Sequence, residues 1–223
     1  MIIFSANEKR EPDFTLAENT FVTGLFVDPN DHWGVNRAVA DLKKDLQAVT
    51  GQEPPITTAV EASFSKETVL IGTIGKSPLI DGLIAEGRLN VSAIQGKWES
   101  FTIQVLKHPL PGVDNGLFII GSDQRGTIYG IYELCRRIGV SPWSWWADVP
   151  VKKSRALYVR AGTYTQGEPS VKYRGLFLND EAPSLTTWVQ QKFGGFNHHF
   201  YEKVFQLLLR LKANFLWPAM TIP

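Results

Sequence analysis

Residues 171–183, which read VKYRGLFLNDEAP, constrain the fold more than any other stretch of the 223-residue chain. Their first half is apolar and aromatic enough for a strand that is buried on both faces, as in parallel sheets. The strand stops at Asn179, Asp180 and Glu181, and Pro183 then prevents further ladder pairing. Ligand chemistry in α/β sheets and barrels lies at the carboxyl ends of strands. The pattern therefore predicts a site there, although an Asp-Glu pair can equally cap the next helix.

The residues that follow complete a β-α-β pattern. Asn197 is placed to cap a helix through Lys212, and residues 214–218 form a second apolar strand that contains Trp217. A crossover of this kind predicts two parallel strands. Two strands and one helix cannot bury each other's apolar surface, so we expect a truncated chain in which residues 166–223 open a (β/α)8 TIM barrel. The apolar stripe expected on the helix consists of Tyr201, Val204, Phe205, Leu208 and Leu211.

Residues 1–165 are expected to form a separate N-terminal α/β sandwich domain. Helices are predicted after the first, second and last of its main strands, and Gly51 is expected to end the first helix. The charged face of that helix, which includes Asp41 and Asp45, is expected to be solvated. The main strands are predicted at residues 21–27, 68–72, 98–106 and 117–120, with a short strand at residues 157–159.

The turn at residues 121–127, GSDQRGT, connects a predicted strand to a predicted helix. A glycine-rich turn in this position can bind an anion, but this one lacks the lysine of a phosphate-binding loop and the second glycine of the dinucleotide fingerprint. In a structural interpretation, Ser122 or Asp123 caps the helix, while Gly126 and a glycine four residues later let the helix approach the sheet. In a functional interpretation, Asp123 and Arg125 border a pocket.

Three of the seven tryptophans lie within four positions of residues 140–150, VSPWSWWADVP. Trp143, Trp145 and Trp146 cannot all occupy one face of a strand or helix. They are expected either to form a hydrophobic cluster between domains or to form a platform on which sugars stack.

The composition narrows the classes of partner. The formal net charge is +1 and there is no basic run, so neither nucleic acid nor an anionic membrane surface is indicated. No segment approaches membrane-spanning length and residues 1–10 form no signal peptide, so we expect a cytoplasmic protein or an export signal outside this chain. The single cysteine, Cys135, excludes an internal disulfide and a Cys-rich metal site and is expected to be buried. No metal or cofactor is predicted.

Four motifs at residues 121–130, 139–150, 171–183 and 208–220 resemble, in order, those of glycoside hydrolase family 115, the xylan α-1,2-glucuronidases. The resemblance implies an N-terminal α/β domain, a (β/α)8 catalytic barrel, and inverting hydrolysis that removes glucuronic acid or its 4-O-methyl ether from glucuronoxylan or glucuronoxylo-oligosaccharides. It implies that Asp180 is an active-site carboxylate. Members continue for several hundred residues, with further acidic groups, and homo-oligomers could form through those absent domains. The predicted substrate-binding residues are Asn179, Glu181, Asp123, Arg125 and Trp217.

Inverting hydrolysis needs two carboxyl groups about 6.5–9.5 Å apart. Asp180 and Glu181 are sequence neighbours whose side chains point to opposite faces of an extended strand, so they are a poor acid/base pair by themselves. The 223-residue chain is therefore expected to have no significant turnover. Two other functions are weighed: a non-catalytic carbohydrate-binding module that uses the three tryptophans, and a domain at residues 1–165 that only supports the barrel.

Overall fold

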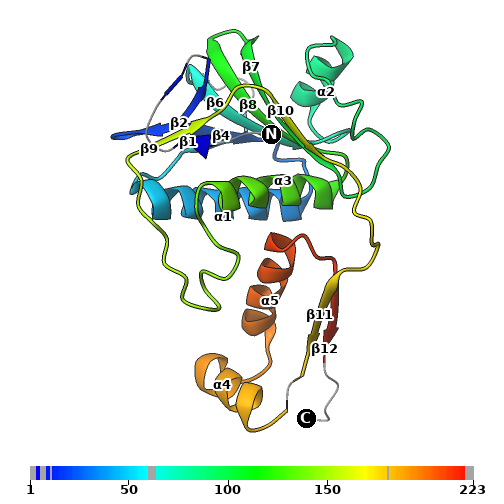
Figure 1. Cartoon of the computed structure of the whole chain (residues 1–223). Coiled ribbons are helices and arrows are strands. Elements are labelled where there is room, and N and C mark those ends of the chain that lie inside the picture. Colours follow the sequence, from blue (N-terminus) through cyan, green and yellow to red (C-terminus); the bar gives the residue numbers. More distant parts are fainter. Residues whose placement is uncertain (1–3, 6–8, 11, 60–63, 180, 219–223) are drawn as a thin grey trace. The chain divides into compact units, whose positions relative to one another are not determined.

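The computed structural model describes residues 4–5, 9–10, 12–59, 64–179 and 181–218. The chain divides into two compact units, Met1–Pro169 (unit 1) and Ser170–Pro223 (unit 2), each described by itself (Figure 1). Both are mixed α/β structures. Among the described residues, no helix is both long enough and apolar enough to cross a membrane.

Unit 1 is built on a six-stranded sheet with the order β10-β7-β8-β6-β4-β5. The neighbours β5, β4, β6 and β8 are parallel, whereas β7 runs antiparallel to β8 and β10 antiparallel to β7. The strands predicted at residues 68–72 and 117–120 are confirmed as the central pair β6 and β8. The bounds are β4 Gly24–Val27, β5 Ile56–Thr57, β6 Glu67–Thr73, β7 Phe101–Leu110, β8 Val113–Gly121 and β10 Thr163–Gln166.

A second, four-stranded sheet has the order β1-β9-β2-β3, with β1 Phe4–Ser5, β2 Phe14–Glu18, β3 Phe21–Val22 and β9 Ala156–Val159. The single strand expected at residues 21–27 is wrong, because β3 pairs in this sheet and β4 in the other. The residue between them, Thr23, is fully buried and its hydroxyl donates a hydrogen bond to the Thr15 carbonyl at 2.6 Å. This bond holds the chain where it passes from one sheet to the other.

Tyr158 of β9 gives this sheet a pH dependence. Its hydroxyl donates a hydrogen bond to the Glu18 carboxylate, which together with burial raises the pKa of Tyr158 to about 12. The folded pKa exceeds the ordinary value near 10, so the stabilisation is complete below about pH 10 and is lost as the pH rises through about 12.

We expect the substitution Tyr158→Phe to lower the free energy of unfolding at pH 8 by about 1–3 kcal/mol, because it removes the hydrogen bond that Tyr158 donates to the charged Glu18 carboxylate. Absorbance titration at 295 nm is expected to lose one late tyrosine ionisation near pH 12. The exposed Tyr173 provides the control, since Tyr173→Phe is expected to leave the late step in place. A late step that persists in Tyr158→Phe would contradict the assignment.

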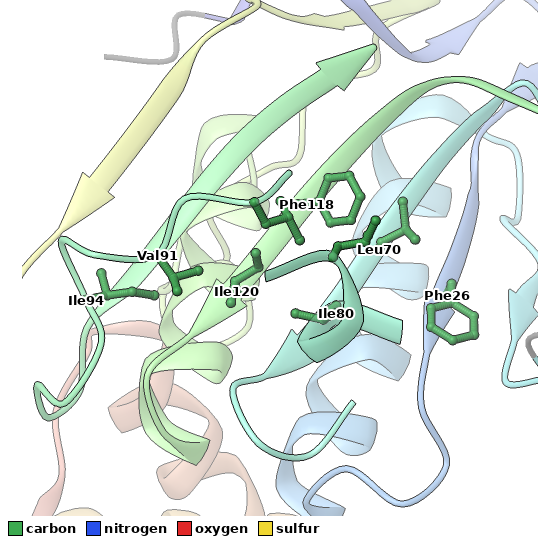
Figure 2. Close-up of a cluster of buried hydrophobic side chains, with 9 residues drawn as sticks. Phe26, Leu70, Ile80, Val91, Ile94, Phe118 and Ile120 are labelled. Carbon is green, nitrogen blue, oxygen red and sulfur yellow. The ribbon is translucent and has the colours of Figure 1, made fainter. Parts of the chain in front are cut away.

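Helices cover both faces of the large sheet. The helices α1 (Trp33–Thr50) and α3 (Gln124–Arg137) lie side by side on one face, and α2 (Pro78–Ala85) lies on the other (Figure 1). The predicted helix ends are confirmed: Gly51 ends α1 with a left-handed φ of 79°, and Pro78 is the first residue of α2. Figure 2 shows the core on the α2 face, formed by buried residues that include Phe26, Leu70, Phe118, Ile120, Ile80, Val91 and Ile94.

The charged face predicted on α1 is not uniformly solvated. Asp41 is 2% exposed and Asp45 is also buried. The Asp41 carboxylate pairs with Arg37 and accepts a hydrogen bond from the Tyr132 hydroxyl of α3 at 2.7 Å. Helix α3 packs along this flank of α1, so it covers aspartates that the periodicity of α1 alone assigns to solvent.

Unit 2 contains β11 (Gly175–Leu178), α4 (Ser184–Phe193), α5 (His198–Arg210) and β12 (Phe215–Pro218). The strands β11 and β12 pair in parallel, as predicted. Asn197 caps α5 by accepting hydrogen bonds from the backbone N–H groups of His199 and Phe200, also as predicted. The predicted stripe on α5 is partly wrong, because Phe205 is 50% exposed while Phe200 and Leu207 are buried. Phe200 packs against Phe193 and Phe196, so the buried face of α5 includes residues that lie outside the predicted stripe.

Candidate functional site

The carboxyl ends of β11 and β12 lie at the same edge of the two-stranded sheet. Leu178 at the end of β11 pairs with Pro218 at the end of β12, so Asn179 follows β11 at the edge that Trp217 approaches from β12. Asn179 and Glu181 are both exposed. Asp180 lies outside the described residues. The sheet thus places an amide, a carboxylate and an indole at one edge.

A polar contact at the opposite, amino end of the two strands fixes this pairing. The Arg174 backbone N–H donates to the Asn214 side chain at 3.0 Å, and the Arg174 guanidinium donates to the Lys212 carbonyl at 2.9 Å. Asn214 in turn donates to the Lys172 carbonyl at 2.7 Å. Arg174 is therefore engaged at the end of the sheet that lies away from Asn179 and Glu181.

Gly175 permits the close approach of the two strands, since an added Cβ would lie 2.0 Å from the Phe215 carbonyl oxygen. Any side chain at this position would collide with backbone and displace β12. The register that brings the two carboxyl ends together thus depends on glycine at the first residue of β11.

One face of the two-stranded sheet is aromatic. Phe177 and Trp217 are register partners and meet edge to face with ring centroids 6.0 Å apart, and Tyr173 meets Phe215 in the same way at 6.1 Å. All four rings are exposed, Trp217 by 60%. The prediction that β11 is buried on both faces is therefore wrong for this face. The other face, with Leu176, Leu178 and Leu216, is half-buried.

The predicted site residue Asp123 lies in unit 1, where it caps α3. One carboxylate oxygen accepts from the Gly126 N–H at 2.7 Å, and the other accepts from the Glu99 N–H at 2.8 Å. The structural interpretation of this turn is thus confirmed for Asp123, the alternative in which Ser122 caps is not adopted, and the substrate-binding role stays a prediction.

Arg125 forms an ion pair with Glu99, with its Nε 2.7 Å from the carboxylate. The Arg125 side chain is 53% exposed, whereas Glu99 is only 1% exposed. Its contact with substrate also stays a prediction. The sequence interpretation missed Glu99, because it placed this residue inside the strand predicted at residues 98–106. That start is wrong: β7 begins at Phe101, and Glu99 lies in a bend before it with a left-handed φ of 51°.

A buried polar network fills the space behind this turn, at the carboxyl ends of β4 and β6. Asp31 accepts from the Thr73 backbone N–H at 2.7 Å and from the Thr73 hydroxyl at 2.9 Å. The Thr73 hydroxyl also lies 2.7 Å from that of Thr127 on α3. These groups satisfy one another within the protein, so they join the loop between β4 and α1 to β6 and α3.

The tryptophan segment after α3 has no regular secondary structure at residues 140–155. Trp145 and Trp146 are half-buried and meet edge to face with centroids 4.8 Å apart, while Trp143 is 42% exposed. Two of the rings therefore pack on each other. The two predictions for this segment, a cluster between domains and a sugar platform, both remain untested.

Within the described ranges, no group of three His, Cys, Asp or Glu side chains is placed to hold a metal ion. Cys135 is fully buried, as predicted. An open cavity of about 430 Å³ lies beside the turn between β7 and β8 and is lined by residues that include Arg88, His108 and Asp114. None of its lining residues is a predicted site residue.

Comparisons with known proteins relate both units to glycoside hydrolases. Residues 166–222 match the family model described as glycosyl hydrolase family 115. The structure resembles BtGH115A, a family GH115 4-O-methyl-α-glucuronidase with specificity for decorated arabinogalactans, with a TM-score of 0.75 and 33% sequence identity over 93% of this chain. The chain spans 26% of the length of that enzyme.

Two more distant structures share the fold alone. CpGH84D matches with a TM-score of 0.53 at 10% identity, over 98% of this chain and 29% of its own. A Streptomyces plicatus β-hexosaminidase matches with a TM-score of 0.52 at 15% identity, over 94% of this chain and 32% of its own. No curated protein sequence matches the chain. The family model and the 33% identity agree with the motifs of the sequence, and the chain belongs to glycoside hydrolase family 115.

Proposed function

We propose that this chain forms the N-terminal α/β domain and the first β-α-β repeat of a (β/α)8 barrel in a glycoside hydrolase. The observation that carries the proposal is the parallel pairing of β11 and β12, whose carboxyl ends bring Asn179, Glu181 and Trp217 to one edge within the segment that matches family 115. Active sites of such barrels lie at this end of the strands. The exposed aromatic face of β11 and β12 would face the barrel interior, where side chains fill the core.

The proposed reaction is inverting removal of glucuronic acid, or its 4-O-methyl ether, from a glycan. Asp180 supplies one of the two carboxyl groups that inversion needs, about 6.5–9.5 Å apart. Glu181 is its immediate sequence neighbour and is not assigned the second role, because the two carboxyl groups of an inverting enzyme flank the bond that is broken and adjacent residues are poorly placed to do so. The second group then comes from a later strand of the barrel. Asn179 and Trp217 would hold the sugar beside Asp180 through a hydrogen bond and stacking.

The proposed substrate class is a glucuronoxylan-type glycan. BtGH115A is described as specific for decorated arabinogalactans, so the glycan backbone can differ between proteins that share the family. Comparing 4-O-methylglucuronoxylan with an arabinogalactan that is decorated with 4-O-methylglucuronic acid separates the two backbones while the leaving uronic acid stays the same.

We expect the purified 223-residue chain to release no measurable 4-O-methylglucuronic acid from either glycan, because it holds only one of the two carboxyl groups in suitable positions. Anion-exchange chromatography of the released uronic acid measures this directly, with BtGH115A on its decorated arabinogalactan as the positive control. Sustained turnover by the 223-residue chain would show that its own residues supply both groups, and would overturn the barrel proposal.

A further inference from the structure

A bend at residues 98–100 binds three side chains through three consecutive backbone N–H groups. The Trp98 N–H donates to the Glu168 carboxylate at 3.1 Å, the Glu99 N–H to Asp123 at 2.8 Å, and the Ser100 N–H to the Ser122 hydroxyl at 3.1 Å. Consecutive N–H groups around a residue with left-handed φ form a concave surface that favours anions. Here the anions are carboxylates of the protein itself.

The residues that begin α3, together with Ser122 just before them, hold this bend in place. Ser122 donates to the Ser100 carbonyl through both its backbone N–H, at 2.9 Å, and its hydroxyl, at 3.0 Å. Arg125 neutralises the buried Glu99 carboxylate at the centre of the bend. These contacts do not involve Glu168, so they hold the bend in place independently of it.

Glu168 comes from the end of unit 1. Strand β10 pairs with β7 up to Gln166, opposite Phe101, and unit 1 ends at Pro169. The bond from Trp98 to Glu168 continues the connection between these two chain segments beyond the last backbone pair. It lies one residue before the unit boundary.

We propose that Glu168 fixes where the chain leaves unit 1 by accepting the hydrogen bond from the Trp98 N–H, and we call this contact the clamp. Ser122, Asp123 and Arg125 hold the 98–100 bend in the conformation that makes the bond. Asp123 and Arg125 thereby position the connection to unit 2. This inference goes beyond the proposed hydrolysis and does not depend on it, because every group involved lies in unit 1.

The clamp is tested on the whole 223-residue chain with Glu168→Ala, Glu168→Gln and the control Ser170→Ala. Ser170 is exposed in the same connection and lies two residues from Glu168. Glutamine retains an oxygen that can accept the Trp98 N–H, so it separates loss of the hydrogen bond from loss of charge. The readouts are hydrogen exchange of the Trp98 amide, followed by NMR, and the rate of tryptic cleavage after the exposed Lys172.

In Glu168→Ala, we expect Trp98 amide exchange and cleavage after Lys172 each to accelerate about fivefold to tenfold. Glu168→Gln keeps the accepting oxygen but not the charge, so its rates are expected to lie between those of the original chain and of Glu168→Ala, while Ser170→Ala is expected to stay within about twofold of the original chain. Unchanged exchange in Glu168→Ala would overturn the clamp, as would a Glu168→Gln variant as fast as Glu168→Ala. A general loss of folding would accelerate amides throughout the β6–β8 pair, whereas loss of the clamp accelerates only residues near Trp98 and the connection.

Discussion

Asp180→Asn is expected to lower kcat for uronic acid release by about 10²–10⁴-fold, the range over which a positioned acid or base contributes to catalysis. The measurement needs a protein that also contains the part of a family 115 enzyme that this chain does not span. A chimera in which this chain replaces the matching 26% of BtGH115A provides one, since the two proteins share 33% identity over 93% of this chain. An asparagine preserves the size of the side chain but cannot hold or accept the proton, so kcat falls while the sugar still binds.

Glu181→Gln in the same chimera is the matched control. It makes the equivalent chemical change at the adjacent position, to which the proposal assigns no acid or base role. We expect its kcat to stay within about tenfold of the original chimera. The assignment of Asp180 would be contradicted if Asp180→Asn kept more than a tenth of the activity of an active chimera, or if Glu181→Gln caused the larger loss.

The hydrophobic pattern was sufficient to predict the elements whose burial is simple. The one-sided stripe from Val35 to Val49 formed the expected helix, and the continuous apolar run at residues 117–120 formed the expected strand, which is buried on both faces. The four-stranded sheet could not be predicted in the same way, since β1 and β3 have only two residues each. Such strands carry too few side chains to show a period.

For the candidate site, the sequence could predict only which edge of a sheet a residue lies at, because that follows directly from where the residue stands relative to the end of a strand. Asn179 and Glu181 follow β11, so parallel pairing alone brings them to the edge that Trp217 approaches. The environment of Asp123 depends instead on the bend at residues 98–100, which is 24 residues away in sequence and contains a non-glycine residue at positive φ. Buried Asp41 shows the same limit, because its partner Tyr132 is 91 residues away.

Gly126→Ala is expected to lower the free energy of unfolding of unit 1 by about 2–3 kcal/mol, despite the higher helix propensity of alanine. An added Cβ at Gly126 would lie 2.2 Å from the Ser100 carbonyl oxygen and 3.0 Å from its carbonyl carbon. These are backbone atoms held by two hydrogen bonds from Ser122, so they cannot move aside as a flexible side chain would. The first turn of α3 has to lift away from the 98–100 bend.

Gly82 in α2 supplies the control for this effect, because an added Cβ there meets nothing within 4 Å. Gly82→Ala is expected to raise the free energy of unfolding by up to about 1 kcal/mol through helix propensity and a less flexible unfolded chain. Urea unfolding followed by far-ultraviolet circular dichroism measures both variants. If Gly126→Ala unfolds within about 0.5 kcal/mol of the original chain, α3 does not press on the bend as closely as the structure indicates. The same substitution should also accelerate Trp98 amide exchange, since the bend that receives Glu168 rests on this turn.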